Sequence, residues 1–522
     1  MLLWIRMAKL IERLMIFIAA LFFIDCQDIK WTWIDGSQGS NILQSANNPG
    51  GRSGMAYWSY DGYLQYPDYC LGTETLEHDL QVECAKLSQL SVMMFGGEYH
   101  VDQSSNKVKN DLWMYTEHTH TWKMVHNGTG DSEDSVPAPR QLTASCGVKG
   151  SYFVVYGGLD VDEHVLGDTW IYYISDNEWY KLQDFRDKIG ASNQTGGDQP
   201  AARGDMVVWC TSKEMIIFGG YDEDFGLRHD MWIFDLATLS WHESKISSDL
   251  PADSDFVKHL DYPDGRSGST SWVSGDRLFM LGGNILPKSP RSKHLMIGYS
   301  GDLWDFDLKE RMWTYHKGSR QPCTKAGIYG KLGTASRENE PGCRRRAAAW
   351  VDSRKNLWMF GGDGIDDSQE SISVFKHSRL LSDLWFFDLH TDKWTWKGGE
   401  KSGEQKGSYG DKGDGSHDNL PGSRCEMAVW GVWNYLYLFG GVGHDANGKD
   451  GYLNDVWTLD VHLDESVFKN SPYPGLVFGI IILGCGLIVL MTILYLLGGK
   501  NVRKNEEETK GKYQQIPEDV EA

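Results

Sequence analysis

The sequence predicts an all-β fold built from one four-stranded unit that repeats six times. Two observations support this prediction. Tryptophan and glycine are abundant, with 22 and 59 residues in a chain of 522, as is typical of a protein with many turns and large packed aromatic side chains. Four short motifs also recur six times in the same order, which indicates an architecture of repeated structural units.

The first motif is an apolar run that ends in two glycines, as in "SVMMFGG" and "NLWMFGG". An Asp-x-Trp follows each pair, and five repeats then carry a second tryptophan. A Pro-x-x-Arg precedes each pair. The glycine pairs begin at Gly96, Gly157, Gly219, Gly282, Gly361 and Gly440. The acidic and aromatic positions are Asp111, Trp113 and Trp122; Asp168, Trp170 and Trp179; Asp230, Trp232 and Trp241; Asp302, Trp304 and Trp313; Asp383, Trp385 and Trp394; and Asp455 and Trp457. The arginines are Arg52, Arg140, Arg203, Arg266, Arg344 and Arg424.

This motif set resembles the kelch repeat over about residues 28–462, and the resemblance implies a β-propeller whose blades are four-stranded sheets. The apolar run suits a strand that is buried on both faces. Glycine allows positive φ and close approach of a neighbouring blade, and the tryptophans fill the widening gap between blades. In the kelch family an aspartate usually fixes the turn before its strand, and that role is expected of the six aspartates.

The sixth repeat lacks its fourth strand, because the sequence after "DVWTLDV" contains no second tryptophan motif. A missing strand would leave an open sheet edge. Near the N-terminus, "KWTWIDGS" closely matches the fourth strand of repeat five, "KWTWKGGE". We therefore expect Trp31 and Trp33 to pair beside Val456–Leu459 and to close a six-bladed propeller. A seventh, degenerate blade within residues 55–90 stays open as an alternative.

Two apolar segments predict a membrane protein. "LMIFIAALFFI" follows three basic residues, which is the pattern of a signal peptide, although an uncleaved N-terminal anchor is an alternative. Residues 476–497 carry no charge and are followed by Lys500, Arg503 and Lys504, as expected of a spanning helix with a cytoplasmic C-terminus. The expected divisions are a signal peptide (1–26), a propeller ectodomain (27–465), a juxtamembrane linker (466–475), a transmembrane helix (476–497) and a cytoplasmic tail (498–522). Within the propeller the repeats lie near 88–136, 149–199, 212–262, 275–340, 355–420 and 433–462, with 28–36 closing the last blade.

The chain is therefore expected to be a single-pass type I protein of the plasma membrane or an endomembrane, with its N-terminus extracellular or lumenal. Asn127 and Asn193 lie in glycosylation triplets. Cys70 with Cys84, and Cys323 with Cys343, are the expected disulfides, although spacing does not fix connectivity. Cys146, Cys210 and Cys425 are expected to be buried and free. The net charge of −21 argues against a nucleic-acid partner.

The long loops are expected on one face of the propeller, here called the top, where we place a protein or glycan ligand. Two interpretations of the six arginines stay open. They either form an anion-binding mouth, as arginines do in kelch adaptors of ubiquitin ligases, or each one fastens its own blade. Three acidic loops are expected to form a solvated rim; they contain Asp160, Asp162 and Glu163; Asp222, Glu223 and Asp224; and Asp363, Asp366 and Asp367.

The function predicted from the sequence is a recognition or adhesion receptor that binds its ligand through the top loops. The alternative is a lumenal or extracellular carbohydrate-modifying enzyme, of the oxidase or epimerase type, on the same fold. No catalytic residue, cofactor or metal is expected, because the histidines do not recur at metal-ligand spacing. In the tail, "YQQI" (Tyr513 to Ile516) resembles the sorting signal that clathrin adaptors bind.

Overall fold

The computed structural model describes residues 29–461, except 60–90, 103–104, 118, 129, 131–134, 149, 192–197, 245–261, 287–297, 324–325, 368–377 and 433–434. The expected signal peptide, juxtamembrane linker, transmembrane helix and tail lie outside the described residues, as do Cys70, Cys84, Asn193, Tyr513 and Ile516. Within the described part of the chain, no helix is both long and apolar enough to cross a bilayer. The chain divides into two units after Val461, and the fold below is that of the first unit.

The described strands form six four-stranded antiparallel sheets. The first contains β2 (Ala56–Ser59), β3 (Ser91–Asp102), β4 (Ser105–Thr116) and β5 (Thr121–His126). The second contains β6 (Ala144–Val148), β7 (Tyr152–Leu159), β8 (Val165–Tyr173) and β9 (Glu178–Lys181). The third contains β10 (Val207–Cys210), β11 (Glu214–Phe218), β12 (Met231–Asp235) and β13 (Ser240–Glu243). The fourth contains β15 (Thr270–Ser274), β16 (Arg277–Leu281), β19 (Leu303–Asp307) and β20 (Met312–Lys317). The fifth contains β22 (Ala348–Val351), β23 (Leu357–Phe360), β26 (Leu384–Asp388) and β27 (Lys393–Gly398).

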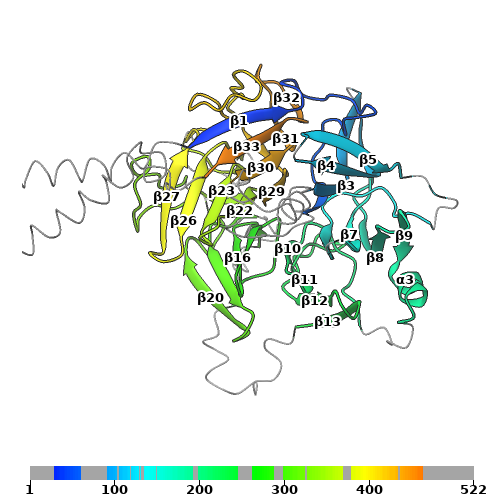
Figure 1. Cartoon of the computed structure of the whole chain (residues 1–522). Helices are drawn as coiled ribbons and strands as arrows, with labels where there is room; N and C mark the ends of the chain where they lie inside the picture. The colour runs from blue at the N-terminus through cyan, green and yellow to red at the C-terminus, as the bar shows by residue number, and fades with distance from the viewer. Residues whose placement is uncertain are drawn as a thin grey trace, which may run out of the picture. The chain divides into compact units, whose positions relative to one another are not determined.

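The sixth sheet joins the two ends of the repeat region. It contains β29 (Ala428–Val432), β30 (Tyr435–Phe439), β33 (Val456–Asp460) and β1 (Lys30–Asp35). Trp31 pairs with Leu459 and Trp33 pairs with Trp457, so the expected pairing of the N-terminal strand is confirmed. Figure 1 shows the blue strand β1 beside the orange strand β33.

Three short ladders extend the later sheets beyond their glycine pairs. They are β14 (Arg266–Ser267), β17 (Asn284–Ile285) and β18 (Gly298–Tyr299); β21 (Arg344–Arg345), β24 (Asp363–Gly364) and β25 (Arg379–Leu380); and β28 (Arg424–Cys425), β31 (Val442–His444) and β32 (Asp450–Tyr452). In the first two sheets, β3 with β4 and β7 with β8 continue through this region with a bulge at the glycine pair. A short helix, α3 (Leu182–Lys188), follows β9 and buries Phe185 against Tyr152 and Tyr173.

The six sheets close into a ring. The innermost strands β2, β6, β10, β15, β22 and β29 each contact the next, and β29 contacts β2. A ring of six backbone hydrogen bonds, 2.8–3.2 Å long, reinforces this circuit at the residue two positions after each repeated arginine. In each bond the N–H of one blade donates to the carbonyl of the preceding blade, in the order Gly54, Leu142, Asp205, Gly268, Arg346 and Glu426, and Gly54 donates to Glu426. All six residues have positive φ, between 52° and 65°, so this backbone turn is a repeated feature that the sequence motifs did not reveal.

The glycine pairs fasten neighbouring blades. The second glycine of each pair donates its N–H to the carbonyl of the arginine in the next blade, as Gly220 does to Arg266 at 2.9 Å. A Cβ on the first glycine, Gly219, would lie 2.4 Å from that carbonyl oxygen, and Gly219 also has φ of 66°. Glycine is therefore required here both for its backbone conformation and for the close approach of the next blade.

The outer tryptophans pack between blades, as expected. Trp179 of the second sheet lies 4.8 Å, between ring centroids, from Phe95 of the first sheet. Trp31 of the sixth sheet lies 5.1 Å from Phe360 of the fifth. Buried aromatic and aliphatic side chains of adjacent sheets form one cluster at each interface, so the core is distributed around the ring rather than gathered at one centre.

Candidate functional site

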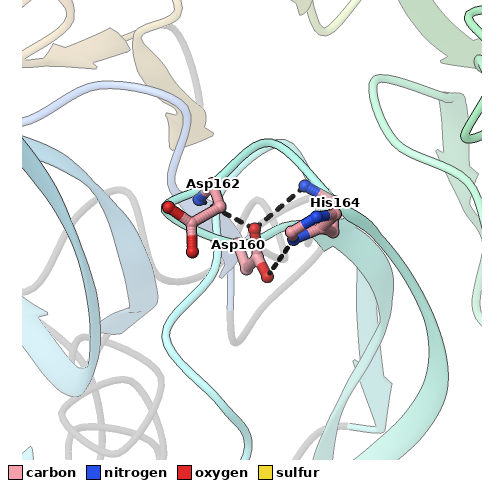
Figure 2. Close-up of side chains that lie close together, drawn as sticks. All are labelled: Asp160, Asp162 and His164. Atoms are coloured by element: carbon pink, nitrogen blue, oxygen red, sulfur yellow. Dashed lines mark hydrogen bonds and ion pairs between the residues drawn. The ribbon is translucent and has the colours of Figure 1, made fainter.

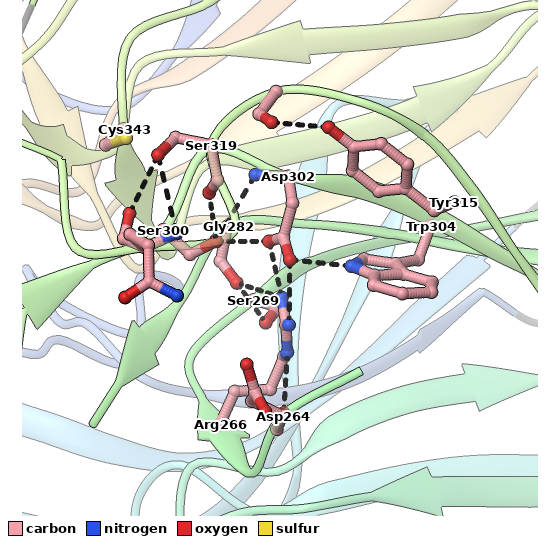
Figure 3. Close-up of polar contacts among 12 residues, drawn as sticks. Asp264, Arg266, Ser269, Gly282, Ser300, Asp302, Trp304, Tyr315, Ser319 and Cys343 are labelled. Carbon is pink, nitrogen blue, oxygen red and sulfur yellow. Dashed lines mark hydrogen bonds and ion pairs between the residues drawn. The ribbon is translucent and has the colours of Figure 1, made fainter. Parts of the chain in front are cut away.

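The six repeated arginines are buried and paired within their own blades. In the fourth blade, Arg266 donates from Nη1 and Nη2 to the two carboxylate oxygens of Asp302, at 2.7 and 3.0 Å, and Nη1 also donates to the Gly282 carbonyl at 3.1 Å. Trp304 Nε1 donates to the same carboxylate at 2.6 Å. Figure 3 shows this network, which joins the Pro-x-x-Arg, Gly-Gly and Asp-x-Trp motifs.

The other five blades repeat this arrangement, with Nη1–Oδ1 distances of 2.5–2.8 Å. The pairs are Arg52–Asp111, Arg140–Asp168, Arg203–Asp230, Arg344–Asp383 and Arg424–Asp455. Each arginine side chain is at most 1% exposed. The anion-binding interpretation is therefore corrected, because the guanidinium groups already bind carboxylates and do not face a mouth. The aspartates likewise bind an arginine and a tryptophan side chain, which differs from the expected role in fixing a turn.

The pKa values of these aspartates reflect the pairing. Burial raises the pKa of Asp302, but Arg266, Ser300 and Trp304 outweigh it and hold the pKa below its usual value. Asp111, Asp168 and Asp230 show the same direction for the same reason, since each binds its own arginine. The network thus keeps these buried carboxylates ionised.

Three residues of the inner hydrogen-bonded ring, Arg346, Asp205 and Glu426, form a second ionic network. Arg346 donates from Nε and Nη2 to Asp205 of the third blade, at 3.1 and 3.0 Å, and Nη1 contacts Glu426 of the sixth blade. The intervening fourth blade contributes Gly268, where a Cβ would lie 2.9 Å from Asp205 Oδ2 and 3.3 Å from Arg346 Cγ. Glycine at this position therefore leaves room for Arg346 to reach past the fourth blade.

Glu426 belongs to this network, and its side chain is 9% exposed. Burial raises the pKa of Glu426, but Arg346, the Ser53 hydroxyl and Arg345 outweigh it, so the carboxyl pKa lies below its ordinary value. Ser53 Oγ donates to Glu426 Oε2 at 2.8 Å. Glu426 therefore stays negatively charged at neutral pH.

A cleft of about 430 Å³ opens beside this network, at the top of the fifth and sixth blades. The short ladders that contain β24, β25, β31 and β32 supply most of its walls. The lining residues are Arg345, Asp363, Ser378, Leu380, Glu404, Cys425, Glu426, Val442, Gly443 and Asp450. The sequence analysis placed the ligand on the top loops, and this cleft lies among them.

The cleft has an excess of negative charge. Its lining contains one arginine and four carboxylates. Arg345 is 28% exposed, donates from Nε to Asp363 at 2.9 Å, and lies over the Tyr299 ring. Arg345 pairs with Asp363 and Arg346 pairs with Glu426. Glu404 and Asp450 remain beside His444 and favour a positively charged group over an anion.

A histidine lies against one edge of the cleft. His444 Nε2 is 2.6 Å from Glu404 Oε2, and His444 Nδ1 is 2.7 Å from Asp450 Oδ1. The hydrogen bond with Glu404 raises the pKa of His444, burial opposes it, and Asp450 adds to the rise. The sequence analysis missed this cluster, because Glu404 lies 40 residues before His444 in the chain, and only the fold brings it to the hairpin that carries His444 and Asp450.

The acidic loops form a solvated rim only in part. In Figure 2, Asp160 Oδ1 accepts the backbone N–H groups of Asp162 and His164, both at 2.9 Å, and Oδ2 lies 3.2 Å from His164 Nδ1. This carboxylate therefore shapes its own turn, as Asp222 does by accepting from Asp224 and Gly226. The remaining exposed members are Asp162, Glu163, Glu223, Asp224 and Asp367. Asp363 and Asp366 are buried, so the expectation of a solvated rim is wrong for these two residues.

The cysteines differ from the sequence prediction at one pair. Cys323 and Cys343 form a disulfide with a Cα–Cα distance of 6.0 Å, as predicted, and Cys425 is free and buried. Cys146 and Cys210 are bonded to each other with a Cα–Cα distance of 5.3 Å, so the prediction that they are free is wrong. They lie on β6 and β10, the innermost strands of adjacent blades. Asn127 is exposed, as a glycan acceptor requires.

Comparison with known proteins places these repeats in a wider context. Residues 83–321 match the family model described as the KLHDC2/KLHL20/DRC7 Kelch-repeats domain. An F-box/kelch-repeat protein of Arabidopsis thaliana is 24% identical over 280 residues, covering 52% of this chain and 53% of the relative. Kelch domain-containing protein 1 of Homo sapiens is 22% identical over 262 residues, covering 44% and 54%. Multiple epidermal growth factor-like domains protein 8 of Mus musculus is 22% identical over 211 residues, covering 40% of this chain and 6% of the relative. The chain thus spans about half the length of the first two relatives.

Proposed function

Since the chain belongs to the kelch-repeat family, whose domains generally bind proteins, we propose that it is a recognition receptor that binds a protein ligand through the cleft on the fifth and sixth blades. The observation that supports this proposal is the cleft of about 430 Å³ within the top loops. Rigid sheets hold these loops, and recognition residues concentrate on loops that a rigid scaffold positions.

The ligand group that suits this cleft is cationic. Four carboxylates and one arginine line it, and the whole chain carries a net charge of −21. A lysine or arginine side chain on an exposed segment of a partner protein would offset this charge. The long-range field of the chain would also accelerate its encounter with a basic partner.

The membrane setting belongs to the same proposal. The apolar segment 476–497 and the basic residues after it support a type I single-pass protein of the plasma membrane or an endomembrane. Tyr513 would then lie in a cytoplasmic tail, within reach of a clathrin adaptor. A Tyr513→Ala variant is expected to accumulate at the cell surface, and unchanged surface levels would contradict the sorting role.

The ligand proposal is tested with the full-length chain and fluorescent peptides of equal length that are rich in lysine, glutamate or serine. A chelator in the buffer removes metal ions. We expect only the basic peptide to bind, with an affinity that falls as salt is added. The double variant Glu404→Gln/Asp450→Asn should weaken binding about tenfold, since it removes two charges from the cleft.

The matched control is Glu163→Gln/Glu223→Gln, which removes two exposed charges from the rim of the second and third blades. It should leave the affinity within about twofold. Equal weakening by both double variants would mean that the peptide senses net charge rather than the cleft. Binding of a glycan panel in place of every peptide would favour the glycan ligand and refute a cationic protein segment.

A further inference from the structure

We propose that His444 and Asp450, with Glu404 behind the imidazole, form a binding site for a divalent transition-metal ion such as Zn²⁺ at the edge of the cleft. The three residues bring one ligand atom each to within 4.8 Å of one another. His444 is only 6% exposed, whereas the Asp450 side chain is 79% exposed, so the site lies at the edge of the protein surface.

The second nitrogen of His444 offers a place for a ligand. Nδ1 is buried and makes no hydrogen bond of good geometry, and its nearest charged group is Asp450 Oδ1 at 2.7 Å. A buried nitrogen without a hydrogen bond is costly, and an electropositive species between Nδ1 and Oδ1 would satisfy both atoms. That species is either a second proton on the imidazole or a metal ion.

Glu404 prepares the ring for a metal. Its carboxylate accepts the hydrogen from Nε2 at 2.6 Å, which leaves the lone pair on Nδ1 when the imidazole is neutral. A carboxylate behind a ligating histidine fixes the tautomer and makes the nitrogen a stronger ligand. Glu404 is thus the orienting residue, and His444 and Asp450 are the ligands.

The backbone holds the two ligands in place. His444 is the last residue of β31 and Asp450 the first of β32, and the two are partners across the hairpin. Asp445 fastens the connecting turn, because its Oδ1 accepts the N–H groups of Asn447 and Lys449 at 2.8 and 3.0 Å. The site is therefore built on a short ladder rather than on a free loop.

A transition metal would fit after a small movement of Asp450. Zinc binds histidine nitrogen and carboxylate oxygen at about 2.0–2.2 Å in tetrahedral geometry, so two ligand atoms on one ion lie about 3.3–3.6 Å apart. The Nδ1–Oδ1 distance is 2.7 Å and the Asp450 side chain is 79% exposed, so its carboxylate would move away from the ring by about 0.6–0.9 Å to admit the ion. A mixed imidazole and carboxylate pair favours zinc over calcium or magnesium, which prefer oxygen ligands alone. The remaining positions on the ion are left for water or for a donor group of a bound partner.

The proposal is tested by equilibrium dialysis of the full-length chain against Zn²⁺ after its metals have been stripped with a chelator. Bound zinc is counted by mass spectrometry, and no peptide is present, so the outcome does not depend on the proposed function. We expect Asp450→Asn to weaken one zinc site at least tenfold. Its side chain is 79% exposed, so this variant keeps the fold. Glu404→Gln should weaken the same site about 10- to 100-fold, and His444→Gln should abolish it.

The matched control is His316→Gln. His316 also lies between two carboxylates, with Nε2 2.8 Å from Asp305 and Nδ1 3.0 Å from Asp392, but both of its nitrogens are hydrogen-bonded. Its loss should leave zinc binding unchanged. A chain that binds no zinc, or binds it equally after Asp450→Asn, would overturn the proposal and leave the doubly protonated imidazole as the occupant. Loss of zinc from His316→Gln as well would show binding to histidines in general, which also overturns it.

Discussion

The seam between the two ends of the repeat region gives the sharpest test of the fold. Trp31 lies on β1, the strand supplied by the N-terminal part of the chain, and is 4% exposed. Its ring packs edge-on against Phe360 of the fifth blade and Trp457 of the sixth. A Trp31→Ala substitution would therefore remove contacts on both sides of the last interface between blades.

The size of the effect follows from burial. A buried tryptophan removes about 150–250 Å² from water, and Trp→Ala substitutions in a core cost about 3–5 kcal/mol. β1 pairs with β33 along one edge, and at its other edge Trp31 and Trp33 accept backbone N–H groups of Ser416 and Gly413. The loss should therefore act on the seam first. If the whole cost lowers the free energy of local opening at the seam, amide exchange there should speed up about 10²- to 4 × 10³-fold, since each 1.4 kcal/mol is a factor of ten.

The assay is amide hydrogen exchange followed by mass spectrometry, read in peptides that cover β1 and β33 and, as an internal standard, β11. Trp33→Ala is the control, because Trp33 is only partly buried on the same strand. We expect fast exchange in the seam peptides of Trp31→Ala and little change in β11. Equal acceleration in all three strands, or none in β1 and β33, would refute the idea that the seam is an independent opening unit.

Three further predictions concern the repeated networks. Asp383→Asn should lower the free energy of unfolding by about 3–5 kcal/mol, because it leaves the buried Arg344 without its ionic partner. Urea unfolding measures this free energy, and a loss below about 1 kcal/mol would contradict the prediction. Gly268→Ala should cost about 1–3 kcal/mol in the same assay, since its φ is 65° and the new Cβ would press on Asp205, whereas an unchanged midpoint would show that the axis can adjust. The third prediction concerns acid, because the pKa values of Asp111 and Asp302 are lowered in the folded protein. Their contribution to stability is complete above the unfolded pKa, about 3.8–3.9, and is lost as the pH falls through the lower folded values. Tryptophan fluorescence should therefore show an acid transition below about pH 4, and full loss of structure by pH 6 would contradict this cause.

The repeat and its closure could be predicted because they depend on local sequence signals. An apolar run, a glycine pair and Asp-x-Trp each report the environment of a single strand, and the match between residues 30–37 and 393–400 identified the missing strand. The pairing of Trp31 with Leu459 then followed from counting strands. A regular β architecture is readable from the sequence when each repeat carries its own markers.

The partners of the side chains were less predictable. Arg203 and Asp230 are 27 residues apart and Arg52 and Asp111 are 59 apart, so no fixed spacing shows that they form the same pair. The bond between Cys146 and Cys210 depends on two innermost strands lying side by side, which only the ring determines. The inner hydrogen-bonded ring could not be recognised either, because its residues share a positive φ but no residue type.

The candidate site was predictable only as a face of the molecule. Long loops marked the top, but Glu404 lies 40 residues before His444, and only the fold brings it to the hairpin on which His444 and Asp450 are partners. Sequence spacing has no means of showing such a meeting. The residue types were visible, and their arrangement was not.

The seam also sets the order in which the propeller can be completed. β1 is synthesised before any blade, but the strand with which it pairs, β33, ends about 430 residues later at Asp460. During synthesis at about 5–20 residues per second, β1 would therefore wait roughly 20–90 seconds with an unpaired edge. Five blades can form their strand pairs in that time, yet none of them can accept β1 without displacing its own fourth strand. The seam therefore cannot close before the last blade has been synthesised, and a factor that shields a lone strand would have most effect on the earliest part of the chain.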